Sequence, residues 1–341
     1  MFDNNSIDVS FCLPVYNVGK YLEDCIKSII NQPFNGINFE IICVDDCSTD
    51  NSYDVLINLS KMYTQIRVLK NEKNKGVSFT RNRMIDVAKG EYIWFVDPDD
   101  MLIYGAVSYV RKAQNLNADV LLGNYIRIKE DGQIPFNPSN NDFDSDKIVI
   151  SSSFVPVDHQ GTKMSACWAG VFKKKLLIEK SLRFNEKMIA QEDTLFYYQF
   201  SLKTKSIYKA ETYCYLYRIR STSIMHLRND ERSKKYYFSM LEMFRVYQEH
   251  YINKDYNDKE IIEDKMLHSR QNIATCLASI QDDMFVKEQY KYIKSAKIYP
   301  YPFRLKTLKG NDKISLRVLR FLMPLKFMFR VYRHIYKIKK V

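Results

Sequence analysis

The sequence predicts an α/β fold, an open and mostly parallel sheet flanked by helices, followed by a basic helical C-terminal extension. Short apolar runs alternate with amphipathic helical patterns over residues 9–100. This alternation is typical of parallel strands joined by right-handed crossovers. Residues 92–96 are apolar without interruption, as expected of a strand that helices cover on both faces.

The first strand is predicted at residues 9–13, and Pro14 ends it because proline removes a ladder hydrogen bond. The pattern that follows predicts a helix with one apolar face. This face comprises Tyr21, Leu22, Cys25, Ile26, Ile29 and Ile30. The second strand, residues 39–44, is apolar and ends in Asp45 and Asp46.

Residues 48–50 (Ser-Thr-Asp) favour the start of a second helix, because these side chains cap helix N-termini. Its inward face comprises Val55, Leu56, Leu59 and Met62. A third strand at residues 66–69 and a turn-rich loop precede a helix at residues 77–89, which Gly90 is predicted to close. The apolar run at residues 92–96 is the fourth strand.

Beyond residue 100 the pattern continues with both kinds of element and no internal repeat. We predict helices at residues 104–115 and 174–180 and from residue 189, strands at 119–127, 167–172 and 213–217, a polar loop at 129–147, and helical structure at 229–295. Residues 151–157 fit either a strand or an acceptor loop. We therefore divide the chain into a catalytic α/β domain (1–225), a helical region (226–303) and a basic tail (304–341).

The basic tail carries most of the formal net charge of +12. It holds twelve Lys or Arg residues and one acid, Asp312, so the body of the chain is near neutral. Apolar residues alternate with these cations, and Pro324 divides the tail into two amphipathic helices. Such helices suit the anionic inner surface of a membrane. The alternatives are packing on the protein body or on a second subunit in a homodimer.

The cysteines and the N-terminus indicate a cytoplasmic protein. The chain has seven cysteines, an odd number, with no Cys-x-x-Cys pair, which favours a reducing compartment. The polar N-terminus lacks the apolar region of a signal peptide. No apolar stretch approaches the roughly 20 residues that span a bilayer. We expect a cytoplasmic protein that associates peripherally with the inner face of the plasma membrane.

Carboxylates follow two of the predicted strands. Asp45 and Asp46 end the second strand, and Asp97 and Asp99 follow the fourth. The carboxyl ends of parallel strands share one edge, where ligands bind in open α/β sheets, so these side chains are expected to converge. Alternate residues of an extended segment point to the same side, so Asp97 and Asp99 can hold one Mn²⁺ or Mg²⁺ ion. The alternative is helix capping by Asp99 or Asp100.

These stretches, in this order, resemble glycosyltransferase family 2, inverting nucleotide-sugar enzymes of the GT-A fold, and specifically the type that builds bacterial surface polysaccharides. The resemblance covers roughly residues 8–225. The matching motifs are LPVYN at residues 13–17, VDDCSTD at 44–50, NKG at 74–76, TRN at 80–82, FVDPDD at 95–100 and QED at 191–193. Pro98 and Cys47 depart from the family pattern, which often has Ser and Gly there, but neither stands for a family ligand.

The resemblance implies a site for the donor nucleotide. It places Asp46 at the base, usually uracil, together with Pro14, Tyr16 and the loop of Asn74 and Gly76. A carboxylate can accept the uracil N3–H, which cytosine lacks, and an aromatic ring can stack on a base. Asp45 is the alternative, as a cap of the next helix.

The resemblance also implies the groups around the diphosphate and the metal ion. Asp97 would contact ribose and metal, and Asp99 the metal. Arg81 would reach a phosphate or Asp97, with a salt bridge away from the donor as the alternative. Arg218 and Arg220 are further candidates for binding the diphosphate. His226 is a candidate third metal ligand, and the alternative is that this histidine has a structural role.

The second acid of the Glu192–Asp193 pair matches the family's general base. Asp193 would take the proton from an acceptor hydroxyl that attacks the anomeric carbon in line. Glu192 would contact the acceptor, and Trp168 would form a platform for the sugar or the acceptor. The alternatives are that both acids only complement a helix dipole and that Trp168 is a core residue.

The function predicted is transfer of a sugar, from a UDP-sugar, to a saccharide or lipid-linked oligosaccharide in capsule, lipopolysaccharide or exopolysaccharide synthesis. A nucleotidyltransferase of related fold is the first alternative, but residues 14–17 stand where it needs a Gly-rich phosphate loop. A basic module for membranes or nucleic acid is the second. We expect no nucleic-acid partner, because the positive charge is confined to the tail and lines no groove with stacking aromatics.

Overall fold

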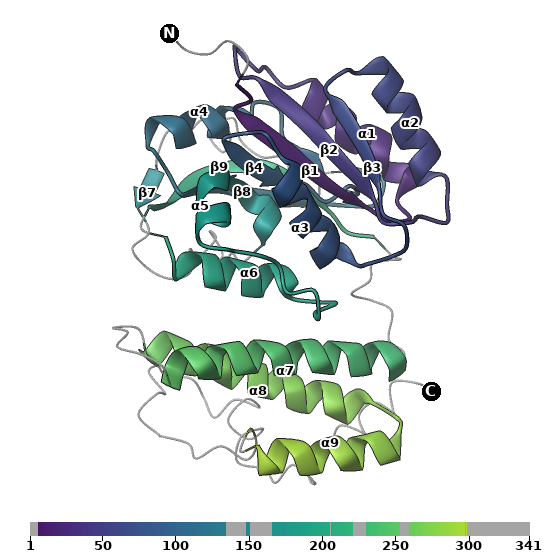
Figure 1. Ribbon diagram of the computed structural model, residues 1–341, viewed down its shortest axis with the longest axis vertical. Helices are drawn as coiled ribbons and strands as arrows, with labels where there is room; N and C mark the ends of the chain where they lie inside the picture. The colour runs from purple at the N-terminus through teal and green to yellow at the C-terminus, as the bar shows by residue number, and fades with distance from the viewer. Residues whose placement is uncertain are drawn as a thin grey trace. The chain divides into compact units, whose positions relative to one another are not determined.

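The computed structural model describes residues 6–133, 148–150, 166–204, 206–220, 230–252, 259–296 and 298 (Figure 1). The chain forms two compact units, Met1–Ser223 and Ile224–Val341. The predicted site at His226, the undecided segment at residues 151–157 and the basic tail lie outside the described residues.

The first part of the sheet is parallel, as the strand–helix alternation predicts. Strands β1 (Val9–Val15), β2 (Phe39–Asp45), β3 (Ile66–Lys70) and β4 (Tyr92–Phe95) lie in the order β3-β2-β1-β4. All three pairings among them are parallel. In the register, Val15 pairs with Asp45, and Asp45 pairs with Lys70. These strands therefore end at a common edge.

The second part of the sheet is mixed. Strand β8 (Gly170–Lys173) is inserted antiparallel between β4 and β6 (Val120–Ile128). Strand β9 (Ile207–Arg218) is parallel to β6, and β5 (Met101–Leu102) and β7 (Ile148–Ile150) are antiparallel to β9. A Cβ atom at Gly170 would overlap with the carbonyl oxygen of Leu121, so only glycine allows this close pairing.

Helices cover both faces of this sheet, and the alternation of side chains along the buried strands divides the core in two. Helices α1 (Gly19–Ile30), α2 (Ser52–Met62) and α4 (Ser108–Asn115) pack on a core that includes Phe11, Leu13 and Trp94. Helices α3 (Val77–Val87), α5 (Lys174–Glu179) and α6 (Glu192–Ser201) pack on the other, which includes Cys12 and Phe95. Burial on both faces explains the uninterrupted apolar run of β4.

Gly90 does not close α3, which ends at Val87 with an extended C-cap at Ala88. A Cβ atom at Gly90 would lie 2.5 Å from the backbone nitrogen of Ser10, and the Gly90 N–H donates to Ser10 Oγ at 2.8 Å. The glycine is required because two backbones approach closely there, a contact that local sequence does not reveal.

The described part of the second unit contains helices α7 (Asp230–Ile252), α8 (Lys259–Ser279) and α9 (Asp283–Ser295). The Arg270 guanidinium of α8 lies 4.7 Å from the centre of the Phe244 ring of α7. Asp282 caps α9, with its carboxylate accepting the N–H groups of Met284 and Phe285. Among the described residues, no helix is both long and apolar enough to cross a bilayer.

Candidate active site

The carboxylates predicted to converge do lie at one edge of the sheet. Asp45 is the last residue of β2, and Asp97 follows β4 by two residues. Backbone bonds continue the ladder past both strand ends, from Asp46 N–H to Val15 O at 2.8 Å and from Val96 N–H to Cys12 O at 2.9 Å. Because β1 lies between β2 and β4, this edge holds both acidic segments.

Two arginines pair with the acids that follow β4. The Arg81 guanidinium of α3 donates to Asp97 Oδ1 at 2.8 Å and to Glu192 Oε1 at 2.8 Å. Arg220 Nε lies 2.6 Å from Asp99 Oδ2. The Arg81 side chain is 5% exposed, so this cation is desolvated between two carboxylates. Arg81 thereby joins the acid pair of α6 to the segment that follows β4.

Asp99 and Asp100 are buried carboxyl groups that lie close to other carboxylates. Burial and the neighbouring Asp97 raise the pKa of the Asp99 carboxyl above its ordinary value. Burial and the charge of Asp99 raise the pKa of Asp100 well above the ordinary value. Asp100 is 1% exposed, and its Oδ1 accepts the backbone N–H of Arg218 at 2.7 Å. Asp100 thus holds the end of β9, and among the described residues it is not the N-cap of any helix whose cap is defined.

The donor chemistry at Asp97 and Asp99 fits a hard divalent cation. Within the described residues, no group of three or more His, Cys, Asp or Glu side chains is arranged to hold a metal. A Mg²⁺-type ion usually keeps several waters and takes one or two protein carboxylates together with substrate phosphates. The ion pairs with Arg81 and Arg220 engage one oxygen of each carboxylate and leave its second oxygen outside them. The chemistry of these two aspartates is therefore compatible with such an ion.

Asp193 lies in the first turn of α6, beside Glu192. Its Oδ1 accepts the Thr194 N–H at 2.7 Å. Burial of the carboxyl and the adjacent Glu192 charge raise the pKa of Asp193 to about 7, although Arg81 acts in the opposite direction. Gln191 precedes the helix in the left-handed conformation, with φ of 60°, which sets the direction in which α6 begins. A carboxyl with this pKa can act as a base near neutral pH.

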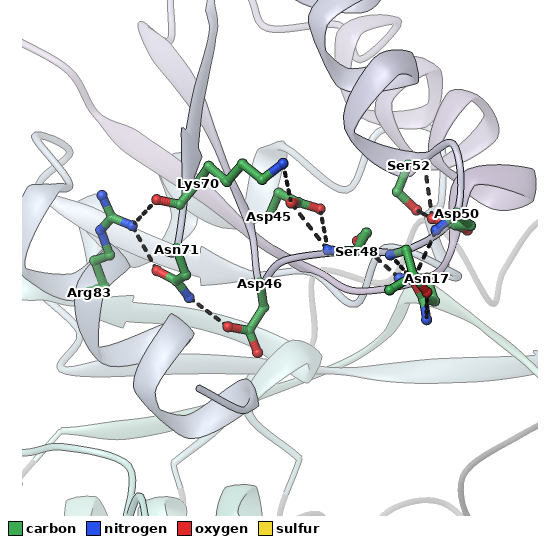
Figure 2. Close-up of polar contacts among 10 residues, drawn as sticks. Asn17, Asp45, Asp46, Ser48, Asp50, Ser52, Lys70, Asn71 and Arg83 are labelled. Atoms are coloured by element: carbon green, nitrogen blue, oxygen red, sulfur yellow. Dashed lines mark hydrogen bonds and ion pairs between the residues drawn. The ribbon is translucent and has the colours of Figure 1, made fainter. Parts of the chain in front are cut away.

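Asp46 accepts hydrogen bonds from the loop that joins β3 to α3 (Figure 2). Asn71 Nδ2 and the Lys75 N–H donate to Asp46 Oδ1 at 2.7 and 2.8 Å, and the Gly76 N–H donates to Oδ2 at 2.7 Å. Gly76 has φ of 87° and precedes α3, a conformation that favours glycine. The loop thus wraps around the carboxylate predicted to meet the base.

Asp45 has a local role. It is fully buried, its carboxylate accepts the Ser48 N–H at 3.2 Å, and Lys70 Nζ lies 3.9 Å away. It supports the turn before α2 and does not cap that helix, whose N-cap is Asn51.

The remaining residues predicted for the donor base differ in exposure. Tyr16 is 43% exposed directly after β1, and Asn74 is exposed in the β3–α3 loop. Pro14 is buried within β1, so the prediction that it ends the strand is wrong: the pairing with β2 continues to Val15. Asn17 ties the segment after Tyr16 to the turn before α2, since its Oδ1 accepts the Thr49 N–H at 2.8 Å. The backbone that bears Tyr16 is therefore held in place next to the end of β2, which Asp46 follows.

The two arginines predicted for the diphosphate lie together on Tyr21 of α1. The Arg218 and Arg220 guanidinium carbons are 5.3 and 5.4 Å from the centre of the Tyr21 ring. Arg218 is 5% exposed, and it donates to the carbonyl oxygens of Asp99 and Glu130 at 2.9 and 2.7 Å. The Arg218 guanidinium is therefore engaged in hydrogen bonds to the protein backbone, whereas Arg220 forms an ion pair with Asp99.

Trp168 lies inside an aromatic cluster. Its ring stacks on Tyr215 and Tyr217 with centroids 4.6 and 5.4 Å apart, and Tyr125 meets it edge-on at 5.0 Å. It is 8% exposed. This packing is that of a core residue, with a small accessible part.

Sequence reasoning did not single out Asn71, Arg83, Tyr21 or Glu130 as parts of the site. Asn71 was recognisable only as the start of a turn-rich loop, and Tyr21 only as part of the apolar face of α1. Their partners lie from 9 to 199 positions away along the chain, and no local pattern records such contacts.

The comparisons with known proteins all identify glycosyltransferases. A family model described as Glycosyl transferase family 2 matches residues 10–177. The glycosyltransferase GlyG of Streptococcus pneumoniae serotype 4 is 34% identical over 65% of this chain and 74% of its own length. The GalNAc(5)-diNAcBac-PP-undecaprenol beta-1,3-glucosyltransferase of Campylobacter jejuni is 31% identical over 70% of this chain and 73% of its own length.

A solved structure shares the fold. The crystal structure of S. aureus TarS 1–349 in complex with UDP-GlcNAc superimposes with a TM-score of 0.59 at 21% identity. The match covers 85% of this chain and 79% of that one. The open sheet flanked by helices predicted from the sequence is therefore confirmed.

Proposed function

The chain belongs to glycosyltransferase family 2, and on that premise we propose that it is an inverting, metal-dependent enzyme that transfers a sugar from a UDP-sugar to a saccharide hydroxyl. The relatives support a role in synthesis of a cell-surface polysaccharide, since two of them are named for transfer to poly(ribitol phosphate) and to an undecaprenol-linked oligosaccharide. Among the geometric features, one carries the proposal: Arg81 links Asp97 directly to the Glu192–Asp193 pair.

A uridine donor is supported by the chemistry of Asp46 and by the neighbours. The carboxylate suits the uracil N3–H, and the exposed Tyr16 directly follows β1, the strand that pairs with β2. The TarS structures were obtained with UDP and with UDP-GlcNAc.

In the proposed reaction, Asp193 accepts the proton of the acceptor hydroxyl as the oxygen attacks the anomeric carbon. The new glycosidic C–O bond forms as the bond to the β-phosphate oxygen breaks, and UDP leaves with the electron pair. Attack opposite to the departing group inverts the anomeric centre. Arg81 holds Glu192 and keeps the start of α6 beside Asp97, so that base and donor end meet.

A divalent ion held by Asp97 and Asp99 would neutralise the charge that develops on the departing diphosphate. Arg220 is the cation of this chain best suited to assist, because its only acidic partner among the described residues is Asp99. Arg218 would act indirectly, by holding the backbone of Asp99 and Glu130.

The basic tail, residues 304–341, is proposed to bind the inner membrane surface, where a lipid-linked acceptor would be found. Its support is the density of Lys and Arg among apolar residues. Packing on a second subunit is the competing role.

Calorimetric titration of UDP with and without Mn²⁺ tests the proposal. We expect binding that strengthens at least about tenfold with the ion, since an ion held by Asp97 and Asp99 would offset the negative charge of the diphosphate. A panel of UDP-sugars should then show slow hydrolysis of one donor. Absent or metal-independent UDP binding would contradict the proposal. Release of pyrophosphate from a nucleoside triphosphate and a sugar phosphate would point to a nucleotidyltransferase.

A further inference from the structure

A short chain of polar side chains leads from the surface of α3 to Asp46 (Figure 2). Arg83 Nη1 donates to Asn71 Oδ1 at 2.7 Å and to the carbonyl oxygen of Lys70 at 2.7 Å. Asn71 Nδ2 donates to Asp46 Oδ1 at 2.7 Å and to Thr80 Oγ1 at 3.1 Å. Asn71 is 4% exposed, so its amide has no alternative partner in bulk water.

The two ends of this chain fix the orientation of the Asn71 amide. A guanidinium can only donate hydrogen bonds, and an ionised carboxylate can only accept them. The Asn71 oxygen must therefore face Arg83, and the Asn71 nitrogen must face Asp46. If Arg83 were absent, the Asn71 oxygen would lose the donor that holds it, and the amide could shift away from the position in which its nitrogen meets Asp46.

The arrangement also limits what else Asp46 can bind. Each carboxylate oxygen has about two acceptor positions. Oδ1 takes the donors of Asn71 and Lys75, and Oδ2 takes the Gly76 N–H. One acceptor position therefore remains, on Oδ2. Asp46 is 3% exposed, so only a group that enters at this point reaches it.

We propose that Asn71 and Arg83 are positioning residues that set nucleobase specificity by aiming the remaining acceptor position of Asp46 at the base. The inference rests on the proposed function, because it requires a uracil N3–H as the incoming donor. Uracil offers one N–H donor at that place, and cytosine offers an acceptor, so a rigid carboxylate distinguishes them. A carboxylate free to rotate could instead turn away from the cytosine nitrogen.

The test is the ratio of UDP to CDP affinity, measured by calorimetry on the full chain with Mn²⁺. The variant is Arg83→Met, which keeps the length of the side chain and removes its donors. We expect the preference for UDP to fall about fivefold or more, the effect of losing one hydrogen bond to a buried group. Arg83→Lys, which keeps one charged donor, should restore most of the preference.

Arg67→Met is the matched control. Arg67 also lies beside α3 and also donates to a backbone carbonyl, that of Val87 at 3.1 Å, but it does not contact Asn71. This variant should keep the wild-type ratio of UDP to CDP affinity. A general loosening of α3 would instead lower this ratio in Arg67→Met as well as in Arg83→Met. Asn71→Ala is a second variant that should lose the preference in the same way as Arg83→Met.

The outcomes separate this inference from the proposed function. A wild-type protein that binds UDP and CDP equally, or neither, would overturn the uridine donor and the inference with it. A wild-type preference for UDP that both Arg83→Met and Asn71→Ala retain would overturn the inference alone. Equal losses in Arg67→Met and Arg83→Met would also overturn it, because the effect would then not pass through Asn71.

Discussion

The Arg81 guanidinium is an ion-pair partner of Asp97 at 2.8 Å, and the same side chain pairs with Glu192, 111 positions further along the chain. Arg81 is buried, and the two carboxylates are 26% and 11% exposed. Removal of this cation leaves two poorly solvated carboxylates facing each other. The pair therefore contributes to the stability of the first unit as well as to the geometry of the site.

Replacement of Arg81 by Met should reduce the free energy of unfolding of the first unit by about 3 kcal/mol or more. Urea unfolding followed by tryptophan fluorescence measures this unit specifically, because both tryptophans, Trp94 and Trp168, lie in it. Arg183→Met is the matched control. Arg183 is 33% exposed, pairs with Asp86 at 2.8 Å and donates to the carbonyl oxygens of Leu177 and Leu182, so its loss should cost less than that of the buried Arg81. Equal effects of the two substitutions would contradict the assignment.

The parallel part of the fold was predictable because its signals are local. Apolar runs, caps and turns alternate along residues 9–96, and the parallel arrangement then brings Asp45, Asp46 and Asp97 to one edge. The antiparallel insertion of β8 between β4 and β6 was not predictable. Its residues are apolar, as in other buried strands, but their sequence does not indicate which strands β8 pairs with.

The predicted site was less complete than the predicted fold, for the same reason. Acid types and positions were visible at strand ends, but the partners of those acids were not. Arg218 was expected at the diphosphate, whereas its guanidinium donates to the backbone oxygens of Asp99 and Glu130. Asp46 was expected to meet a base, and the structure adds the three loop donors that surround it. Such bonds depend on distances between segments, which only the fold defines.

The basic tail gives a prediction that depends on charge. The wild-type chain should bind vesicles that contain anionic lipid, and truncation after Phe303 should abolish this binding, since it removes twelve cationic residues. Co-sedimentation at increasing salt measures the effect, with neutral vesicles as the control. Unchanged vesicle binding by the truncated chain would indicate that the tail packs on protein. Sedimentation velocity of both chains would then show whether that protein is a second copy.

Substitution of Trp168 can show whether this residue is part of the core or forms a platform for the acceptor. Replacement by Ala removes a ring that stacks on Tyr215 and Tyr217, and should lower the free energy of unfolding by about 3–5 kcal/mol. The remaining fluorescence of Trp94 follows the transition. Tyr104, which is 75% exposed, provides the matched aromatic control, and Tyr104→Ala should have little effect on stability. A stable Trp168→Ala protein with a raised KM for the acceptor would instead support the platform.

Replacement of Asp193 by Asn should abolish sugar transfer and leave UDP binding within about twofold of wild type, since the variant loses the proton acceptor but no proposed donor contact. Transfer is measured with a radiolabelled UDP-sugar, and binding by calorimetry. Asp54→Asn, in the first turn of α2, is a control for the loss of one acid near a helix N-terminus. Undiminished turnover in Asp193→Asn would remove this residue from its proposed role.

The raised pKa of Asp193 predicts how stability depends on pH. The folded protein holds this proton up to about pH 7, whereas the ordinary value is 3.8. Between these values the folded state binds more protons than the unfolded state, so the contribution of Asp193 to stability falls as pH rises from about 4 to about 7. The difference in stability between Asp193→Asn and wild type should therefore grow across this window. A constant difference would indicate an unshifted carboxyl.

The same pKa predicts the pH dependence of catalysis. A general base acts only when ionised, so kcat/KM should rise with pH and level off above about 7. Glu192 is a main cause of the raised pKa, after burial, so Glu192→Gln should move the acid limb of the profile to lower pH. This shift is a sharper test than loss of activity, because a distorted site would lower the rate without moving the limb in that direction. A limb that stays in place in Glu192→Gln would mean that another group governs it.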